Sequence, residues 1–272
     1  QCRYQFSLRD AVDITLLQRA LTTALASAPY YTQRLVQEKR EMWLEPNTEP
    51  CLVYPGSTMR NIPEQTNGYL FCVSCEGDTV YFDWHHFLLD GHGVSPLLTS
   101  ILEQYCNLRY GTAFAVQQIV CDPPYDMQAM LAEHPPVDGG SDAIQRDVVQ
   151  TYEGTLRRTR VCLSKQSLVE KALANNAKPV SALMGLLCMA MREYLGKENI
   201  QYSYSSDTRD VAGVPNALYN CVCSFEHTVQ LHAKTRLADF VSDVDADIKR
   251  DLQPQSKRRR MTEQMGWVYK VD

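Results

Sequence analysis

The residues best suited to chemistry lie together in the segment 85–93, which holds two adjacent histidines, an aspartate and two glycines. His86 is a natural general base, because an ordinary histidine pKa of about 6.5 lets the imidazole accept a proton near neutral pH. Asp90 is placed to hold that ring in one tautomer or to brace the loop. Gly91 and Gly93 permit unusual backbone conformations or the close approach of a substrate. The segment therefore predicts a site of proton transfer.

The same segment has two other interpretations. His85 and His86 would be ordinary strand residues, one facing each side, if Asp90 and Gly91 simply formed a turn. A zinc site built from His85, His86 and His92 is less favoured, because adjacent strand residues point to opposite faces. We therefore predict that no metal is bound.

The elements around the segment are predicted from patterning. Two β-rich runs, 69–75 and 79–85, flank Glu76, Gly77 and Asp78 and predict a hairpin that ends at His85. A helical pattern follows the segment to about residue 108. An earlier helix, capped by Asp13 or Thr15, is predicted from apolar residues at helical spacing. These residues are Leu17, Ala20, Leu21, Ala24 and Leu25.

The segment also carries a resemblance. His85, His86, Asp90 and Gly91 match the HHxxxDG motif of the chloramphenicol-acetyltransferase-like superfamily, which includes synthetase condensation domains, alcohol O-acetyltransferases and wax ester synthases. The order strand, helix, hairpin, motif, helix resembles the first lobe of its two-lobe members. Two later segments resemble the second-lobe stretch in which an Asp-x-Arg strand end precedes an Asn-containing strand. These segments are 206–209 and 216–224.

The resemblance implies roles for the motif residues. His86 would lie in a tunnel between the lobes and remove a proton from a hydroxyl or amine acceptor as it attacks an acyl thioester. Asp90 would pair with an arginine and hold the loop, and His85 would be structural. The resemblance also implies no permanently bound cofactor. The acyl donor would be a co-substrate, either acyl-CoA or acyl-phosphopantetheine on a carrier protein. The candidate partners of Asp90 are Arg209 first, with Arg3 and Arg9 left open.

The leading hypothesis for function is therefore acyl transfer between a small-molecule donor and acceptor, with a carrier protein as a further partner. The second hypothesis is a non-catalytic condensation-like module that binds a carrier protein or peptide and retains the motif for packing. A third is an epimerising relative, in which the same histidine removes a proton from carbon.

The predicted fold is α/β, with two lobes that are each a mixed β-sheet flanked by helices. Several prolines and glycines between residues 111 and 147 predict the lobe boundary, which divides the chain into 1–150 and 151–272. Two complete lobes would need roughly 300 to 400 residues. Because the chain has 272 residues, we expect the second lobe to be incomplete.

Composition excludes several classes of protein. With 27 Lys and Arg against 32 Asp and Glu, the net charge of −5 disfavours a nucleic-acid binder. No apolar run approaches the roughly 18 to 20 residues of a membrane span, and residues 1–10 show no secretory signal. The ten cysteines are dispersed among apolar neighbours, which favours free thiols and a cytoplasmic location. The CxxC spacing of Cys72 and Cys75 lies within a predicted strand, so we expect core thiols.

Two further segments allow alternative interpretations. The apolar helix predicted over 182–194 is expected to be a central core helix, although its methionines would also suit the lining of an acyl tunnel. The basic run 257–260 is expected to be a solvated helix face or tail. Contact with a phosphate of coenzyme A or with a partner's acidic surface is the alternative.

Overall fold

The computed structural model describes residues 1–133 and 161–269 of the chain. These residues form two compact units. The first unit comprises Gln1–Tyr125 and Ala212–Val222, and the second comprises Asp126–Val211 and Cys223–Asp272. The predicted lobe boundary at residue 150 lies outside the described residues.

The first unit is built on a four-stranded sheet in the order β1, β6, β5, β4. β1 and β5 both run antiparallel to β6, whereas β4 is parallel to β5. The predicted hairpin is confirmed, because Glu76 pairs with Thr79 and Gly77 turns the chain at a φ of +60°. The four strands are β1 (Cys2–Ser7), β4 (Val53–Pro55), β5 (Phe71–Glu76) and β6 (Thr79–Trp84).

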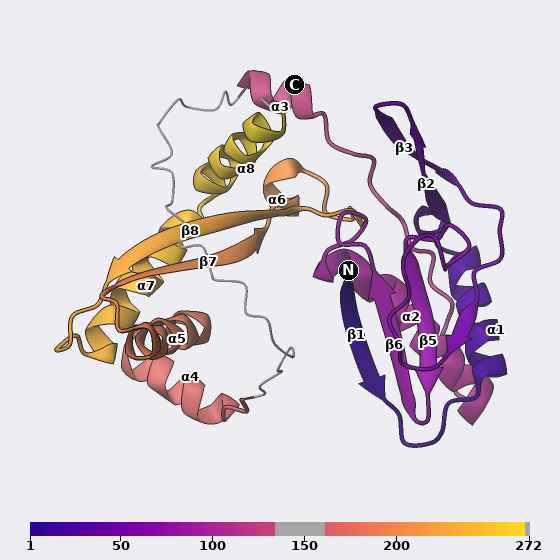
Figure 1. Ribbon diagram of the computed structural model, residues 1–272, viewed down its shortest axis with the longest axis horizontal. Helices are drawn as coiled ribbons and strands as arrows, with labels where there is room; N and C mark the ends of the chain where they lie inside the picture. The colour runs from indigo at the N-terminus through magenta and orange to yellow at the C-terminus, as the bar shows by residue number, and fades with distance from the viewer. Residues whose placement is uncertain (134–160, 270–272) are drawn as a thin grey trace. The chain divides into compact units, whose positions relative to one another are not determined.

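Helices α1 (Ile14–Ala26) and α2 (Gly91–Tyr110) pack against each other and share one apolar core with the sheet (Figure 1). Asp13 caps α1 as predicted, and all the apolar positions that predict this helix are buried. Directly after α1, the chain forms a short 3-10 helix, η1 (Pro29–Tyr31), and then a separate hairpin. The hairpin consists of β2 (Gln33–Glu38) and β3 (Glu41–Pro46).

The alternation of β5 separates the two cysteines of the CxxC spacing. Cys75 belongs to the helix-facing core, and Cys72 lies on the opposite face of the strand. Both are buried free thiols, and burial raises the pKa of Cys72 to about 12. The prediction of core thiols is confirmed. No group of three metal-ligating side chains is found among residues 1–133 and 161–269.

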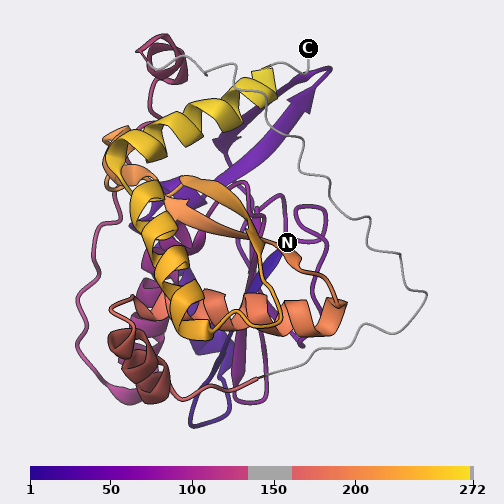
Figure 2. The ribbon, with the colours of Figure 1, turned by 90° about the vertical axis from the view of Figure 1, so that its left-hand side faces the viewer.

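The second unit pairs β7 with β8 and packs helices α5 and α7 against each other. Ser164 caps α4, and Gly196 ends α5 in the left-handed region. α8 follows α7 after a bend (Figure 2). The elements are α3 (Met127–Glu133), α4 (Lys165–Ala174), α5 (Pro179–Leu195), β7 (Asn199–Asp207), α6 (Arg209–Ala212), β8 (Val222–Gln230), α7 (Leu237–Asp251) and α8 (Pro254–Tyr269).

The expectation that α5 is a core helix is confirmed for one face, which packs against β7 and α7, but it is wrong for the opposite face. Its buried residues are small and include Gly185, where a Cβ atom would lie 2.8 Å from Val241 of α7. The larger apolar side chains of α5, such as Leu187 and Tyr194, are exposed. The small residues allow α7 to approach the buried face of α5 closely.

A buried carboxylate joins α5 to α7. Asp245 accepts hydrogen bonds from the Ser181 hydroxyl and the Lys178 backbone N–H, and it pairs with Lys249 at 2.6 Å. Burial raises the pKa of Asp245, but these donors outweigh burial and lower it to about 2. The acid form of this side chain is therefore disfavoured in the folded unit.

Two residues of the basic run 257–260, at the start of α8, make contacts within the second unit. The expectation of a solvated face is therefore wrong for these two residues. Lys257 is 7% exposed and pairs with Asp210 at 2.5 Å. Arg260 donates to the backbone oxygen of Ser224.

Among the described residues, no helix is both long and apolar enough to cross a membrane.

Candidate active site

The motif loop, residues 85–91, leaves the end of β6 and leads directly into α2. Its backbone is held by side chains from the surrounding core. Trp84 donates from its indole to the Leu89 oxygen at 3.0 Å, and Tyr30 donates from its hydroxyl to the Leu88 oxygen at 2.9 Å. The loop is thus fixed by hydrogen bonds from β6 and from η1.

Asp90 is the most buried polar residue of the loop, at 2% exposure. One carboxylate oxygen accepts from the Gly93 N–H at 2.8 Å and caps α2. The other accepts from the Cys221 N–H at 2.9 Å. Asp90 therefore joins the loop to a segment more than one hundred residues later in the chain.

The two glycines of the segment 85–93 differ in what the structure requires of them. A Cβ atom on Gly93 would lie 1.8 Å from the Leu218 oxygen, so only glycine fits this contact. A Cβ atom on Gly91 would approach only the Tyr4 hydroxyl, at an ordinary 3.4 Å. Gly91 does not have the positive φ that would require glycine there. At Gly93 the close approach is between its own backbone and the backbone of Leu218.

His86 is exposed on this otherwise well-held loop. Its Nδ1 lies 3.3 Å from the Asn220 side-chain nitrogen. His85 is half-buried, and its ring lies 5.1 Å from that of Phe87. The two histidines thus occupy different environments, and His86 is the more accessible.

Asn220 and Cys221 reach the loop because residues 212–222 are bound into the first unit. Asn216 donates to the carboxylate of Asp122 from its backbone and its side chain, at 2.7 and 3.3 Å. The Tyr219 hydroxyl donates to the Pro123 oxygen at 3.1 Å. The strand expected over 216–224 begins only at Val222, and the sequence does not predict the contact of Asn220 with His86. No local pattern carries that information.

The nearby phenols are hydrogen-bond donors rather than bases. Burial raises the pKa of Tyr30 and of Tyr31 well above the ordinary tyrosine value, and it raises that of Tyr219 to about 12. Tyr31 donates to the Gly93 oxygen at 2.6 Å. These three phenols are therefore not suited to accept a proton near neutral pH.

Two of the three arginines considered as partners of Asp90, Arg3 and Arg209, have identified contacts. Arg3 binds both oxygens of Asp83, at 2.6 and 2.7 Å, so the alternative that Arg3 pairs with Asp90 is wrong. Arg209 is 3% exposed and pairs with Asp207 at 3.1 Å within the second unit. Pairing of Arg209 with Asp90 stays a prediction.

No protein-family profile and no curated protein matches the chain. Solved structures do. Polyketide synthase associated protein 5 from Mycobacterium tuberculosis is 18% identical, with a TM-score of 0.74, and the match covers 94% of this chain and 70% of that one. The epimerization domain of the third module of tyrocidine synthetase B is 13% identical, with a TM-score of 0.63 and coverages of 96% and 69%. The first condensation domain of the CDA synthetase is 15% identical, with a TM-score of 0.59 and coverages of 93% and 68%.

These similarities confirm the predicted fold. The chain has the α/β fold of these three solved structures, two of which are an epimerization domain and a condensation domain of peptide synthetases. It spans about 70% of the solved chains, which agrees with an incomplete second lobe. At these identities the comparison concerns the fold alone.

Proposed function

We propose that this chain is an acyltransferase domain that moves an acyl group from a thioester to a hydroxyl or amine acceptor, with His86 as general base. The observation that carries the proposal is an exposed imidazole on a loop whose other parts are fixed by the core. Reactive groups are commonly presented in this way, on a loop held by a rigid scaffold.

The proposed reaction needs one base. His86 takes the proton of the acceptor O–H or N–H as that atom attacks the thioester carbonyl carbon. The tetrahedral intermediate then collapses, the C–S bond breaks, and the imidazolium returns the proton to the thiolate of coenzyme A or phosphopantetheine. Because the thioester is already activated, no covalent enzyme nucleophile is required. General base action of this kind contributes roughly 10² to 10⁴-fold.

Asn220 bears on which ring nitrogen acts as base. If Nε2 of His86 accepts the proton, Nδ1 must already carry one and must donate it to an acceptor. Rotating the Asn220 amide by 180° puts its oxygen where the nitrogen lies, 3.3 Å from Nδ1. In the proposed mechanism Asn220 is therefore a positioning residue that fixes the tautomer.

A purified sample of this chain tests the proposal. Release of thiol from acetyl-CoA and longer acyl-CoAs is followed with a chromogenic disulfide, in the presence of alcohols or amines as acceptors. We expect turnover that His86→Ala reduces by at least about 10²-fold while the circular dichroism spectrum is unchanged. His232→Ala, which removes an exposed histidine of the second unit, is the matched control. Undiminished turnover by His86→Ala refutes the assignment.

A second candidate is the non-catalytic module that binds a carrier protein or peptide. The observation in its favour is that Asp90 and Gly93 are both accounted for by packing alone. This candidate predicts no transfer from any acyl-CoA or acyl-carrier donor, together with saturable binding of a carrier protein. The epimerising alternative predicts that deuterium from the solvent enters the α-carbon of an aminoacyl thioester. Free thiols at all ten cysteines support a reducing, cytoplasmic setting for each of these functions.

A further inference from the structure

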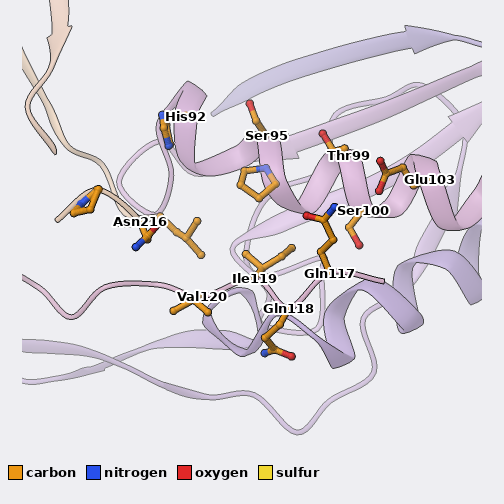
Figure 3. Close-up of a pocket in the computed structure, with 13 residues that line it drawn as sticks. His92, Ser95, Thr99, Ser100, Glu103, Gln117, Gln118, Ile119, Val120 and Asn216 are labelled. Carbon is orange, nitrogen blue, oxygen red and sulfur yellow. The ribbon is translucent and has the colours of Figure 1, made fainter. Parts of the chain in front are cut away.

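A large pocket of the first unit is lined by η1, the β2–β3 hairpin, residues 118–124 and Tyr219. Its volume is about 1010 Å³, at the upper end of the range for small-molecule sites. Residues 118–120 also line a smaller groove along α2 (Figure 3). His86 does not line the large pocket, so a substrate group held there lies away from the reacting atoms.

The lining offers aromatic surface with little spare hydrogen bonding. Its aromatic residues are Tyr30, Trp43 and Tyr219. The hydroxyls of both tyrosines already donate to backbone oxygens, those of Leu88 and Pro123. The lining includes neither lysine nor arginine. A neutral, apolar ligand group therefore suits this pocket better than a sugar or an anion.

Hydrogen bonds hold the walls of the pocket in place. The side chain of Gln33 donates to the backbone oxygen of Tyr30 at 2.7 Å, which joins β2 to η1. The Ile119 N–H donates to the Ser27 oxygen at 2.9 Å, which joins the segment 118–124 to the end of α1. Walls that are fixed before binding reduce the ordering cost that a ligand must offset.

The pocket leaves large apolar side chains in contact with water. Met42 and Trp43 of β3 are 65% and 39% exposed, and Val120 of the segment 118–124 is 61% exposed. A ligand that covers side chains of both segments removes this apolar area from water. Aromatic rings gain further from contact with other aromatic rings. The three aromatic residues of the lining therefore favour an aromatic ligand over an aliphatic one.

The pocket borders the motif loop. The Tyr30 hydroxyl bonds to Leu88, two residues after His86. Tyr219 is followed by Asn220, whose side chain lies 3.3 Å from Nδ1 of His86. We propose that the pocket holds a neutral aromatic ring of the acyl acceptor, with the acceptor hydroxyl or amine on a short arm directed toward His86. This inference rests on the proposed acyl transfer and names its acceptor as an aryl-alkyl alcohol or amine.

Three alcohols that share a primary hydroxyl test the proposal. Tryptophol carries an aromatic ring system, 2-cyclohexylethanol carries an aliphatic ring, and ethanol carries none. In calorimetry at pH 7 we expect tryptophol to bind with a Kd on the order of 1 mM, about fivefold more tightly than 2-cyclohexylethanol. Ethanol should show no saturable binding. Absence of saturable tryptophol binding, or equal binding of 2-cyclohexylethanol, overturns the inference.

The same alcohols, used as acceptors with acetyl-CoA in the thiol-release assay, separate this inference from the proposed function. We expect turnover with a KM for tryptophol about fivefold below that for 2-cyclohexylethanol. Turnover without that preference overturns the inference alone and leaves acyl transfer standing. Binding of tryptophol without turnover from any acyl-CoA overturns acyl transfer, and with it the role of the ring as part of an acceptor.

Variants on two walls identify the pocket. Trp43→Ala is expected to weaken tryptophol binding about fivefold and to remove the preference over 2-cyclohexylethanol. Val120→Asp, at an exposed position outside the hairpin, is expected to weaken it about tenfold, because the ring would desolvate a carboxylate. Phe114→Ala is the matched control, since Phe114 is 48% exposed but does not line the pocket. An unchanged Kd in both Trp43→Ala and Val120→Asp contradicts the assignment.

Discussion

Replacement of Asp90 by alanine is expected to destabilise the first unit strongly. The change removes the acceptor of two buried backbone N–H groups, those of Gly93 and Cys221. Leaving one such group unsatisfied costs about 1–3 kcal/mol. Since the two groups lie at the meeting point of α2 and residues 212–222, we expect the free energy of unfolding to fall by about 4 kcal/mol. That is a large fraction of the roughly 5–15 kcal/mol of a typical domain.

Asp90→Asn separates the two contacts. Asparagine caps helices as well as aspartate does, so its oxygen retains the bond from Gly93. Its NH₂ group then faces the N–H of Cys221 and cannot accept from it. We expect a loss of about 2 kcal/mol, with amide-exchange protection lost at Cys221 and kept at Gly93.

The assay is urea denaturation combined with amide hydrogen exchange, because exchange reports the first unit separately from the second. Asp13→Ala is the matched control, since Asp13 also caps a helix but accepts its bonds in a less buried position. That variant should lose about 1 kcal/mol. If Asp90→Ala loses no more stability than Asp13→Ala, burial of Asp90 and its bond to Cys221 do not stabilise the unit.

Three further predictions concern packing, pH and thiol chemistry. Gly93→Ala should abolish folding of the first unit or cost more than about 3 kcal/mol in urea denaturation, whereas Gly91→Ala should stay within about 1 kcal/mol. The folded-state pKa of Asp245, about 2, lies below the unfolded value. The stabilisation by its carboxylate is therefore present above about pH 4 and is lost as pH falls toward 2. Asp245→Asn should remove that part of the acid sensitivity in a series of thermal melts at different pH values. In thiol labelling at pH 8, exposed Cys162 should react first, and Cys188, whose pKa burial raises to about 11, should react only upon unfolding.

Local patterns predict a large part of this fold. Asp13 followed by apolar residues at helical spacing predicts both the cap and the buried face of α1, because both depend on residues within a few positions. Gly77 at the centre of the β5–β6 hairpin and Gly196 at the end of α5 follow from the left-handed conformations that these turns require. Such features need no knowledge of distant parts of the chain.

Features set by distant neighbours could not be predicted. The apolar composition of α5 indicates burial on all sides, but one face is exposed. Which face is buried depends on the packing of α7, which lies more than forty residues later in the chain. The contacts of Asp90 with Cys221 and of His86 with Asn220 join residues 131 and 134 positions apart. Neither the spacing nor the residue types at one end specify the other.

Packing explains some residues of the segment 85–93 but not His86. This difference decides how much the segment says about catalysis. Packing accounts for Asp90, whose oxygens bind two buried N–H groups, and for Gly93, which fits against the Leu218 oxygen. A chain that had lost its activity would keep both for stability alone. His86 is different, because its ring is exposed and its contact is with another exposed side chain, Asn220. Substituting it should cost little stability, so its effect on thioester turnover is the measurement that distinguishes a catalyst from a retained scaffold.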